Sequence, residues 1–482
     1  MKTIKRKRMR FKGWANIFIC LLSIFAGMTI VLGNKTSFGL FMAVLLFLFF
    51  CTLILRLGIE IARRVVLFFI ISTIPFPYFI QFAGRDAISI TTMTIYFLSA
   101  VMIGYLLLTR RRIHINKFEY ILPLFMIINI TLSLVLNLKF IGQSIRYYTA
   151  NISGILLYFL IITIVQNKSD TLKIIKIILG ALFAQSIICF IQLKIPGLAN
   201  IFNIFGNRSL VTEAYISYGG YIRAIGTVWN YELLSEWFLI GVLLSIALIY
   251  DSGRLKFIIP LFFCLAGLVF TNTRSGILLM PIFMMMAFIL VNGFGKDYSR
   301  LTFKIVFMVC LGGLLLSLVF SEQIMGLAQR LSTYFSSRNL VTSRAIGREK
   351  VWEYSIHAFL SKLTIFGNGL FKADNIYTRA TSFHSLYLTI IYRFGICGML
   401  LHILFWGKLL IESFRTLFTE RDRCNWYLLL FFFNIIILML VDGVKIEYFR
   451  NGHLIQFAWM MYALCVSLLR KGDVSCEDLV VS

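Results

Sequence analysis

Charged residues are scarce in this chain of 482 residues, where they make up 14% of the sequence against about a quarter in soluble domains. Hydrophobic residues make up 59%. A soluble fold of this length cannot hide so much apolar surface, because folded domains still expose much of their chain. The composition therefore argues against a soluble enzyme, a disordered protein and a nucleic-acid-binding domain, and we expect no nucleic-acid partner.

Acidic residues are the scarcer of the two signs, with 21 Asp and Glu against 47 Lys and Arg, which gives a formal net charge of +26. In a soluble protein this excess would suggest nucleic acid. In a chain this apolar it indicates cytoplasmic loops that face anionic lipid, and membrane lipids are thus an expected partner.

Cysteine pairs and proline-rich stretches are missing as well. None of the nine cysteines lies in the two long loops described below and the sequence has no CxxC motif, so we expect neither a disulfide framework nor a cysteine metal site there. Strong internal repeats and low-complexity linkers are also missing from the sequence.

What the chain has instead is a series of long apolar runs. A transmembrane helix needs about 20 mostly apolar residues, and the runs are continuous, unlike the alternating strands of a membrane barrel. We therefore predict an all-α polytopic membrane protein with about 12–14 transmembrane helices. The candidate spans lie near residues 14–32, 38–55, 65–82, 90–108, 118–137, 152–166, 173–193, 233–250, 257–272, 275–291, 305–320, 385–407, 426–441 and 454–469.

The basic residues predict the orientation. With the N-terminus in the cytoplasm, most of the Lys and Arg fall in short inward loops, as the positive-inside rule requires, and an even number of spans places the C-terminus inside too. The first twelve residues hold seven basic residues ahead of an apolar run. Without a small-residue cleavage site after it, we interpret this run as a retained first helix rather than a signal peptide.

The predicted spans and loops divide the chain into six parts. We expect N-terminal transmembrane helices over 1–193, a first outward loop over 194–232, central transmembrane helices over 233–320, a large helical outward loop over 321–384, C-terminal transmembrane helices over 385–470 and a cytoplasmic tail over 471–482. The two outward loops are the segments long enough to hold a site. A site is therefore expected where these loops meet the helix ends.

The large loop is basic, with eight Lys or Arg residues against four Asp or Glu. Within it, residues 346–362 read as an amphipathic helix. Arg344, Arg348 and Trp352 recur at intervals of four, which places them on one helix face. Guanidinium forks match phosphate oxygens. A solvated basic loop that touches lipid headgroups is the alternative interpretation of these arginines.

Two further arginines lie beside apolar runs. Arg274, in TNTRSGILLM, sits at a membrane edge, where a charge is costly unless it is paired or faces a wet cavity. The alternative is a side chain that snorkels to the interface. Arg223, in YIRAIGTVWNYE, has a similar position, and Glu232 is the candidate for a simple ion-pair partner.

His384 directly precedes a predicted membrane helix, which Ser382 or Thr381 could cap. The positive end of that helix favours a neutral imidazole, and a neutral imidazole can accept a proton. An interfacial histidine with a satisfied hydrogen bond is the commoner interpretation of a lone histidine.

Three motifs in this order resemble the O-antigen ligase/polymerase family of bacterial envelope glycan assembly. RAIGTVWNYELLSEW is similar to the family pattern R-x-x-G-T-[FV]-x-N ahead of a helix, and TNTRSG to T-x-[ST]-R-[SG]. FGNGLF followed by HSLYLTIIYRFGICG is similar to G-x-G … H-[NS]-x-[YF]-L-x(4–5)-G-[IL]-x-G. The resemblance covers roughly residues 220–400. In the second motif, the residue two before Arg274 is Asn272.

The resemblance implies a glycosyltransferase of the GT-C type that acts at the outer face of the bacterial inner membrane without a metal or other cofactor. The donor would be a glycan on undecaprenyl pyrophosphate. The acceptor would be a second lipid-linked glycan or lipid A–core. His384 would be the base at the acceptor hydroxyl. Arg274, Arg348 and Arg344 would hold the pyrophosphate, with Arg223 as a further ligand. Chain-length regulator and flippase proteins are candidate partners.

The motifs do not separate a polymerase from a ligase. We favour a polymerase of O-antigen, capsule or exopolysaccharide units with inversion at the anomeric carbon, because nothing in the sequence indicates the outer membrane that ligation to lipid A–core requires. A lipid-linked glycan flippase is the alternative of another class. Transporters often contain broken helices and charges at mid-depth, whereas this chain has six prolines and its charges gather near span ends. A membrane scaffold would need no set of His and Arg beside a loop.

Overall fold

The structure is a computed structural model of the 482-residue chain. Apart from isolated positions, it describes residues 58–76, 79–82, 85–109, 118–138, 141–165, 167–195, 223–228, 230–294, 299–321, 364–370, 383, 385–420, 425–450 and 452–470. The two spans expected before residue 58 and most of both long loops lie outside the described residues.

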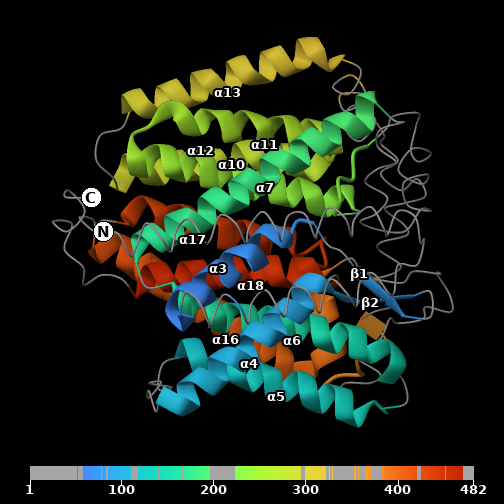
Figure 1. The fold of residues 1–482 in the computed structure, drawn as a ribbon. Helices are drawn as coiled ribbons and strands as arrows, with labels where there is room; N and C mark the ends of the chain where they lie inside the picture. Colours follow the sequence, from blue (N-terminus) through green and yellow to red (C-terminus); the bar gives the residue numbers. More distant parts are fainter. Residues whose placement is uncertain are drawn as a thin grey trace.

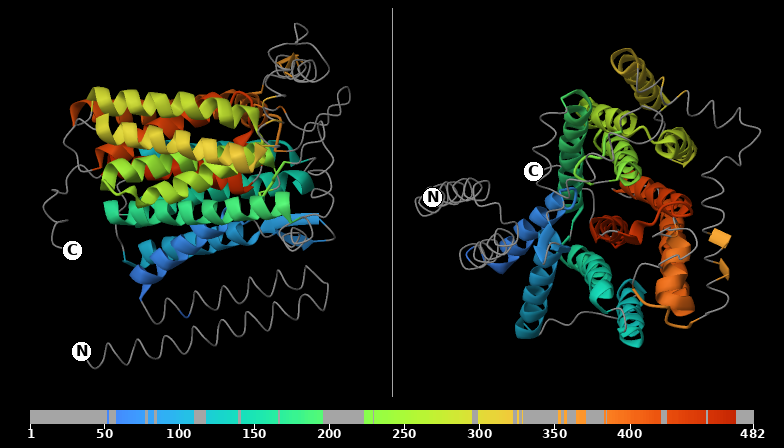
Figure 2. Two further views of the ribbon diagram at one scale, coloured as in Figure 1. Left: turned by 90° about the horizontal axis from the view of Figure 1, so that it is seen from above. Right: turned by 90° about the vertical axis from the view of Figure 1, so that its right-hand side faces the viewer.

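The described residues form a bundle of long helices that run side by side (Figures 1 and 2). Eight of these helices are long and apolar enough to cross a membrane. The predicted all-helical polytopic membrane fold is thus confirmed, and the predicted total of 12–14 spans includes residues that the structure does not describe. The helices are α3 (Ile59–Thr73), α4 (Ile90–Thr109), α5 (Phe118–Leu136), α6 (Ile141–Ile164), α7 (Lys168–Lys194), α10 (Tyr231–Ser252), α11 (Ile258–Thr271), α12 (Arg274–Phe294), α13 (Ser299–Val319), α16 (Leu386–Thr419), α17 (Trp426–Asp442) and α18 (Gly452–Leu469).

Helices α10 and α18 form the centre of the bundle. Both are apolar all round, which is typical of a helix surrounded by protein, and every residue in the apolar window of α10 is buried. α10 packs against α7, α11 and α17, and α18 packs against α6 and α17. Helices such as α4 and α13 at the edge expose large apolar side chains, including Leu107 and Phe303, as a lipid-facing surface requires.

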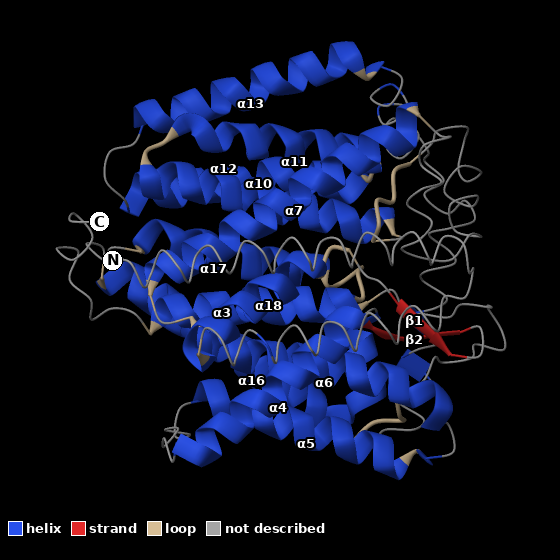
Figure 3. Ribbon diagram, in the orientation of Figure 1, coloured by secondary structure: helices blue, strands red, loops and turns tan. Residues whose placement is uncertain are grey.

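A short hairpin replaces the second half of one predicted span, and the prediction of a helix over 65–82 is wrong in that half. Helix α3 ends at Thr73, and strands β1 (Phe79–Phe82) and β2 (Arg85–Ser89) then pair antiparallel (Figure 3). Pro75 and Pro77 explain this end, because proline lacks the N–H that a helix interior needs and disfavours helical backbone in the residue before it.

Helix α16 is broken at Gly395, whose φ of 72° and ψ of −169° are not helical. The segment 364–370 crosses the helix at this point: Asn368 donates its backbone N–H to the Tyr392 carbonyl at 2.8 Å, and Cys397 donates to Ile365 at 3.0 Å. From α5, the Asn129 amide and the Ser133 hydroxyl donate to the two carbonyls before the break, those of Phe394 and Arg393. Polar backbone freed inside the bundle is thus satisfied by neighbouring elements.

Glycine at 367 makes this crossing possible. A Cβ atom on Gly367 would overlap the Arg393 carbonyl oxygen, and the φ of Gly367 is +87°. We expect Gly367→Ala to destabilise the folded protein by more than about 2 kcal/mol, because alanine at positive φ alone costs about 1–2 kcal/mol and the clash adds to it. The measurement is the thermal unfolding temperature in detergent.

Gly180→Ala is the matched control. Gly180 lies in α7, and a methyl group added at this position would have no neighbouring atom within 4 Å, so this variant should keep or slightly raise the unfolding temperature. Equal effects of the two substitutions would contradict the crossing.

Candidate active site

The segment that carries the first motif is fixed by two glutamines of α7. The side chain of Gln192 accepts from the backbone N–H groups of Ile225 (3.2 Å) and Gly226 (2.9 Å) and donates to the Gly226 carbonyl (3.1 Å). Two helical turns earlier on α7 comes Gln185, which accepts from Thr227 N–H at 3.1 Å. The irregular backbone before α10 therefore finds its hydrogen-bond partners inside the bundle, as buried backbone must.

Two polar side chains of this motif have structural roles. The Thr227 hydroxyl donates to the Pro75 carbonyl at 2.6 Å, which ties the segment to the end of α3. The Asn230 side chain accepts from the N–H groups of Glu232 and Leu233 and caps the N-terminus of α10. Gly226 makes the turn with a φ of 55°. These residues therefore set the path of the chain from Arg223 into α10.

The second motif forms the sharp turn between α11 and α12. Asn272 ends α11 in the left-handed conformation, with φ 48° and ψ 45°. The Thr273 hydroxyl lies 3.3 Å from the Tyr231 carbonyl at the start of α10. Arg274 is the first residue of α12, and Gly276 packs so closely on Ser235 of α10 that a Cβ atom would overlap its hydroxyl. The start of α12 therefore adjoins the start of α10.

These two turns bring Arg223 and Arg274 together. Ala224 N–H donates to the carbonyl of Phe270 at the end of α11, which places the two motifs in contact. Arg223 is half-buried and lies over the Tyr231 ring, 4.5 Å from its centroid, whereas Arg274 is exposed. We refer to the end of the bundle that holds Arg223 and Arg274 as the arginine end.

Two guanidinium groups in one place suit an anion. Burial lowers the pKa of Arg223 and the charge of Arg274 lowers it further, while Tyr231 and Glu232 oppose the shift. Arginine nevertheless stays protonated at neutral pH, because its ordinary pKa is above 12. The negative charge of Glu232 acts on Arg223, as the sequence suggested. The guanidinium groups of Arg223 and Arg274 nevertheless repel each other. A bound phosphate or pyrophosphate would relieve that repulsion.

The N-terminus of α16 also lies at the arginine end. Ser385 caps it by accepting from Leu388 N–H at 3.5 Å, so the cap is Ser385 and not Ser382 or Thr381 as predicted. Leu386 N–H donates to the carbonyl of Gly443, just after α17, at 2.7 Å. The Trp352 indole donates to the Phe383 carbonyl at 3.0 Å, which attaches one described residue of the large loop to this position.

The remaining predicted site residues, His384, Arg344 and Arg348, lie outside the described residues. Phe383 and Ser385, on either side of His384, are described and belong to the start of α16. The structure therefore brings Arg223 and Arg274 together, and the helix start that follows His384 contacts the loop after α17 at the same end of the bundle. Among the described residues, no three His, Cys, Asp or Glu side chains gather as metal ligands.

The sequence interpretation missed several buried charges at the arginine end. Arg393, in α16, is buried, donates to the Phe449 carbonyl at 3.1 Å and lies 4.5 Å from the centroid of the Tyr147 ring. Glu236 of α10 and Asp442 at the end of α17 are also buried. An ionisable residue within an apolar run was the available signal, since such residues in membrane helices are costly and often functional.

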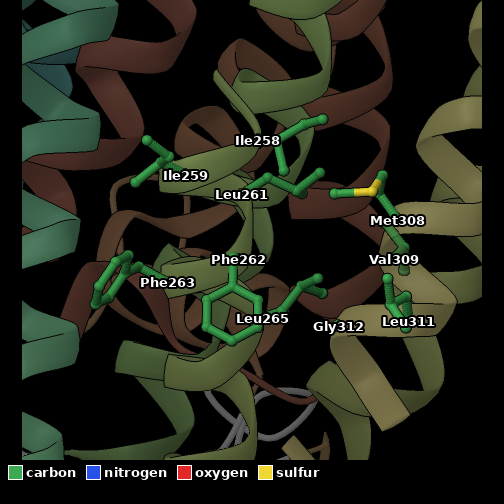
Figure 4. A pocket seen from close by; sticks show the side chains of 10 residues that line it. All are labelled: Ile258, Ile259, Leu261, Phe262, Phe263, Leu265, Met308, Val309, Leu311 and Gly312. Atoms are coloured by element: carbon green, nitrogen blue, oxygen red, sulfur yellow. The ribbon is translucent and has the colours of Figure 1, made fainter. Parts of the chain in front are cut away.

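An apolar pocket of about 310 Å³ lies between α11 and α13, lined by residues such as Phe262, Leu265 and Met308 (Figure 4). Helix α11 joins the arginine end at Thr271. The pocket lies along the other part of this helix, away from Thr271. Its lining has no ionisable side chain, so it fits a hydrocarbon chain and not a reacting sugar.

Residues 259–403 match the family model described as O-antigen ligase. This match supports the resemblance of the chain to the O-antigen ligase/polymerase family. The matched range contains the second and third motifs, including Arg274 and His384, and begins after the first motif. The match supports a membrane glycan ligase or polymerase in the broad sense, and the eight long apolar helices among the described residues agree with a multi-pass membrane protein. The chain has no significant match among curated proteins.

A substitution of Gln192 tests how the first motif is anchored. Gln192→Leu removes the partner of two N–H groups and one carbonyl in a buried segment, and each unsatisfied group costs about 1–3 kcal/mol. We expect a loss of at least about 2 kcal/mol in folding stability, measured by thermal unfolding. Ile187→Ala, on an exposed position of the same helix, should have a much smaller effect; an unchanged Gln192→Leu protein would contradict the anchoring.

Proposed function

We propose that the protein is a polysaccharide polymerase. It would transfer a glycan of O-antigen, capsule or exopolysaccharide type from undecaprenyl pyrophosphate to a sugar hydroxyl of a second lipid-linked repeat unit. The observation that carries the proposal is the meeting of Arg223 and Arg274 at the end of the bundle where α16 begins, directly after His384. The proposal places the protein in the bacterial inner membrane, with both termini in the cytoplasm and this end facing outward.

The arginines stabilise the leaving group in this account. When the bond between the anomeric carbon and the pyrophosphate oxygen breaks, its electron pair stays on the pyrophosphate. Fixed guanidinium groups beside that oxygen stabilise the developing charge. Exposed Arg274 is the first ligand, half-buried Arg223 the second, and Arg348 with Arg344 would join them from the large loop.

His384 supplies the base. The acceptor hydroxyl oxygen forms the new bond to the anomeric carbon, on the face opposite to the leaving pyrophosphate, and its proton passes to the neutral imidazole of His384. The proton then leaves to water. A single displacement of this kind inverts the anomeric configuration.

Ligation is the second candidate, because the matching family model is described as O-antigen ligase. The donor and the chemistry are the same, and the acceptor would be lipid A–core. Purified protein with lipid-linked repeat units and no nucleotide sugar distinguishes the candidates. A polymerase lengthens the glycan with these units alone, whereas a ligase releases glycan only when lipid A–core is added. A flippase would move single units across vesicle membranes without joining them.

Arg274→Ala and His384→Ala test the two roles. Loss of a charge-stabilising group lowers turnover by about 10²–10³ and loss of a general base by about 10²–10⁴. We expect both variants to enter the membrane and to abolish long-chain glycan, as measured by gel analysis of glycan length in cells and by turnover of the purified protein.

Arg254→Ala is the matched control, since Arg254 is an exposed arginine at the opposite end of α10 from Tyr231. It should leave glycan length unchanged. Normal glycan in the Arg274 and His384 variants would refute the site assignment.

A further inference from the structure

Two buried carboxyl groups meet at the arginine end. Glu236 lies in the second turn of α10, and Asp442 is the last residue of α17; their relative exposures are 0% and 1%. Helices α10 and α17 pack together, and a side-chain hydrogen bond with Asp442 is among the interactions that act on Glu236. They come from parts of the chain about 200 residues apart, so their contact belongs to the tertiary fold.

The contact requires a proton. Apart from their mutual contact, neither oxygen of Glu236 has a hydrogen-bond partner among the described residues, and the neighbour of Asp442 is the Lys445 ammonium, 2.8 Å from its Oδ1 atom. Two carboxylates have no donor between them and repel each other without water. A stable contact between them therefore means that one of the two is protonated and donates to the other.

The surroundings identify which carboxyl carries the proton. The Lys445 ammonium is paired with Asp442, whereas it acts on Glu236 only through its charge, and Glu236 sits in an apolar helix, so we assign the proton to Glu236. The other ionisable groups that face the pair are Glu232, on the same helix, and Tyr448, after α17. Burial raises the pKa of the Tyr448 phenol, so that phenol stays neutral as well. The resulting unit is Lys445 ammonium, Asp442 carboxylate and Glu236 carboxylic acid.

The pair joins the two halves of the proposed site. Next to Asp442, the Gly443 carbonyl holds the first N–H of α16, on Leu386. In the same loop, Glu447 accepts from the Thr389 hydroxyl, one turn further into α16, at 3.0 Å. On the other side, Ser235 next to Glu236 packs on Gly276, two residues after Arg274. The contact between Glu236 and Asp442 thus connects helix α10, which packs beside Arg274, with the loop after α17, which binds the start of α16.

We propose that Glu236 and Asp442 form a proton-sharing pair that positions the first turn of α16, and with it His384, against the arginines. Both are positioning residues, because they act through the loop 443–447 and α16 and not on the substrate. The positioning role rests on the proposed glycosyl transfer. The sharing of a proton between Glu236 and Asp442 does not rest on it.

Infrared spectroscopy of the purified protein tests the shared proton without any substrate. The wild type should show the C=O stretching band of a buried protonated carboxylic acid, shifted by deuterium exchange, and this band should be missing from the Glu236→Gln protein. Glu412→Gln, on the far part of α16 where Glu412 pairs with Lys408, should keep the band. A wild-type spectrum identical to that of Glu236→Gln in this region would overturn the proposal.

Variants of the pair test the positioning role. Glu236→Gln keeps a neutral donor of the same shape, and we expect its turnover within about threefold of the wild type. Glu236→Leu fills the space without a donor, and Asp442→Asn leaves Lys445 without its anion; both should lower kcat at least about tenfold with little change in the donor KM, because the base is misplaced while the arginines remain.

The outcomes separate the two proposals. Full turnover in Glu236→Leu would show that the contact serves packing alone and would overturn the positioning role. Equal losses in Glu236→Gln and Glu236→Leu would overturn it too, because the amide should substitute for the acid. If the wild type transfers no glycan at all, the proposed function fails, and the infrared result still decides whether the proton is shared.

Discussion

Every polar group inside an apolar bundle needs a partner from the protein itself, and this constraint organises the arginine end. Irregular backbone occurs there in the segment 223–228, in the turn at Asn272 and at the break in α16. In the first and third of these, side chains of α7 or α5 satisfy the exposed backbone groups. The amide and hydroxyl residues of the buried helices are therefore the scaffold on which the charged side chains are placed.

The charges at this end fall into two groups with different surroundings. Arg223 and Arg274 lie at the helix starts, one half-buried and one exposed, where a ligand can reach them. Glu236, Asp442 and Arg393 are deeply buried, and the structure gives them partners within the protein. Accessible cations suit the recognition of a pyrophosphate, while buried charges that are partnered internally fix the helices around it. This division follows from burial alone and does not depend on the identity of the sugar.

The sequence predicts the helical membrane fold well, because a long apolar run has few other solutions. Through the order of the motifs it also leads to the expectation that Arg223, Arg274 and the residue before the α16 start form one site, and this expectation stays a prediction. It does not predict the hairpin after Pro75, since a short apolar run has the same hydropathy whether it forms a strand or half a helix. The contact between Glu236 and Asp442 depends on the packing of α10 against α17, and no local pattern encodes that packing.

The central claim is that the arginine end binds the pyrophosphate of a lipid-linked glycan. Its most direct test is an electron cryo-microscopy map of the protein in a lipid nanodisc with a polyprenyl diphosphate analogue. The account predicts diphosphate density between Arg223 and Arg274, facing the start of α16. Density for the diphosphate at the opposite end of the bundle, or in contact with neither arginine, would contradict it.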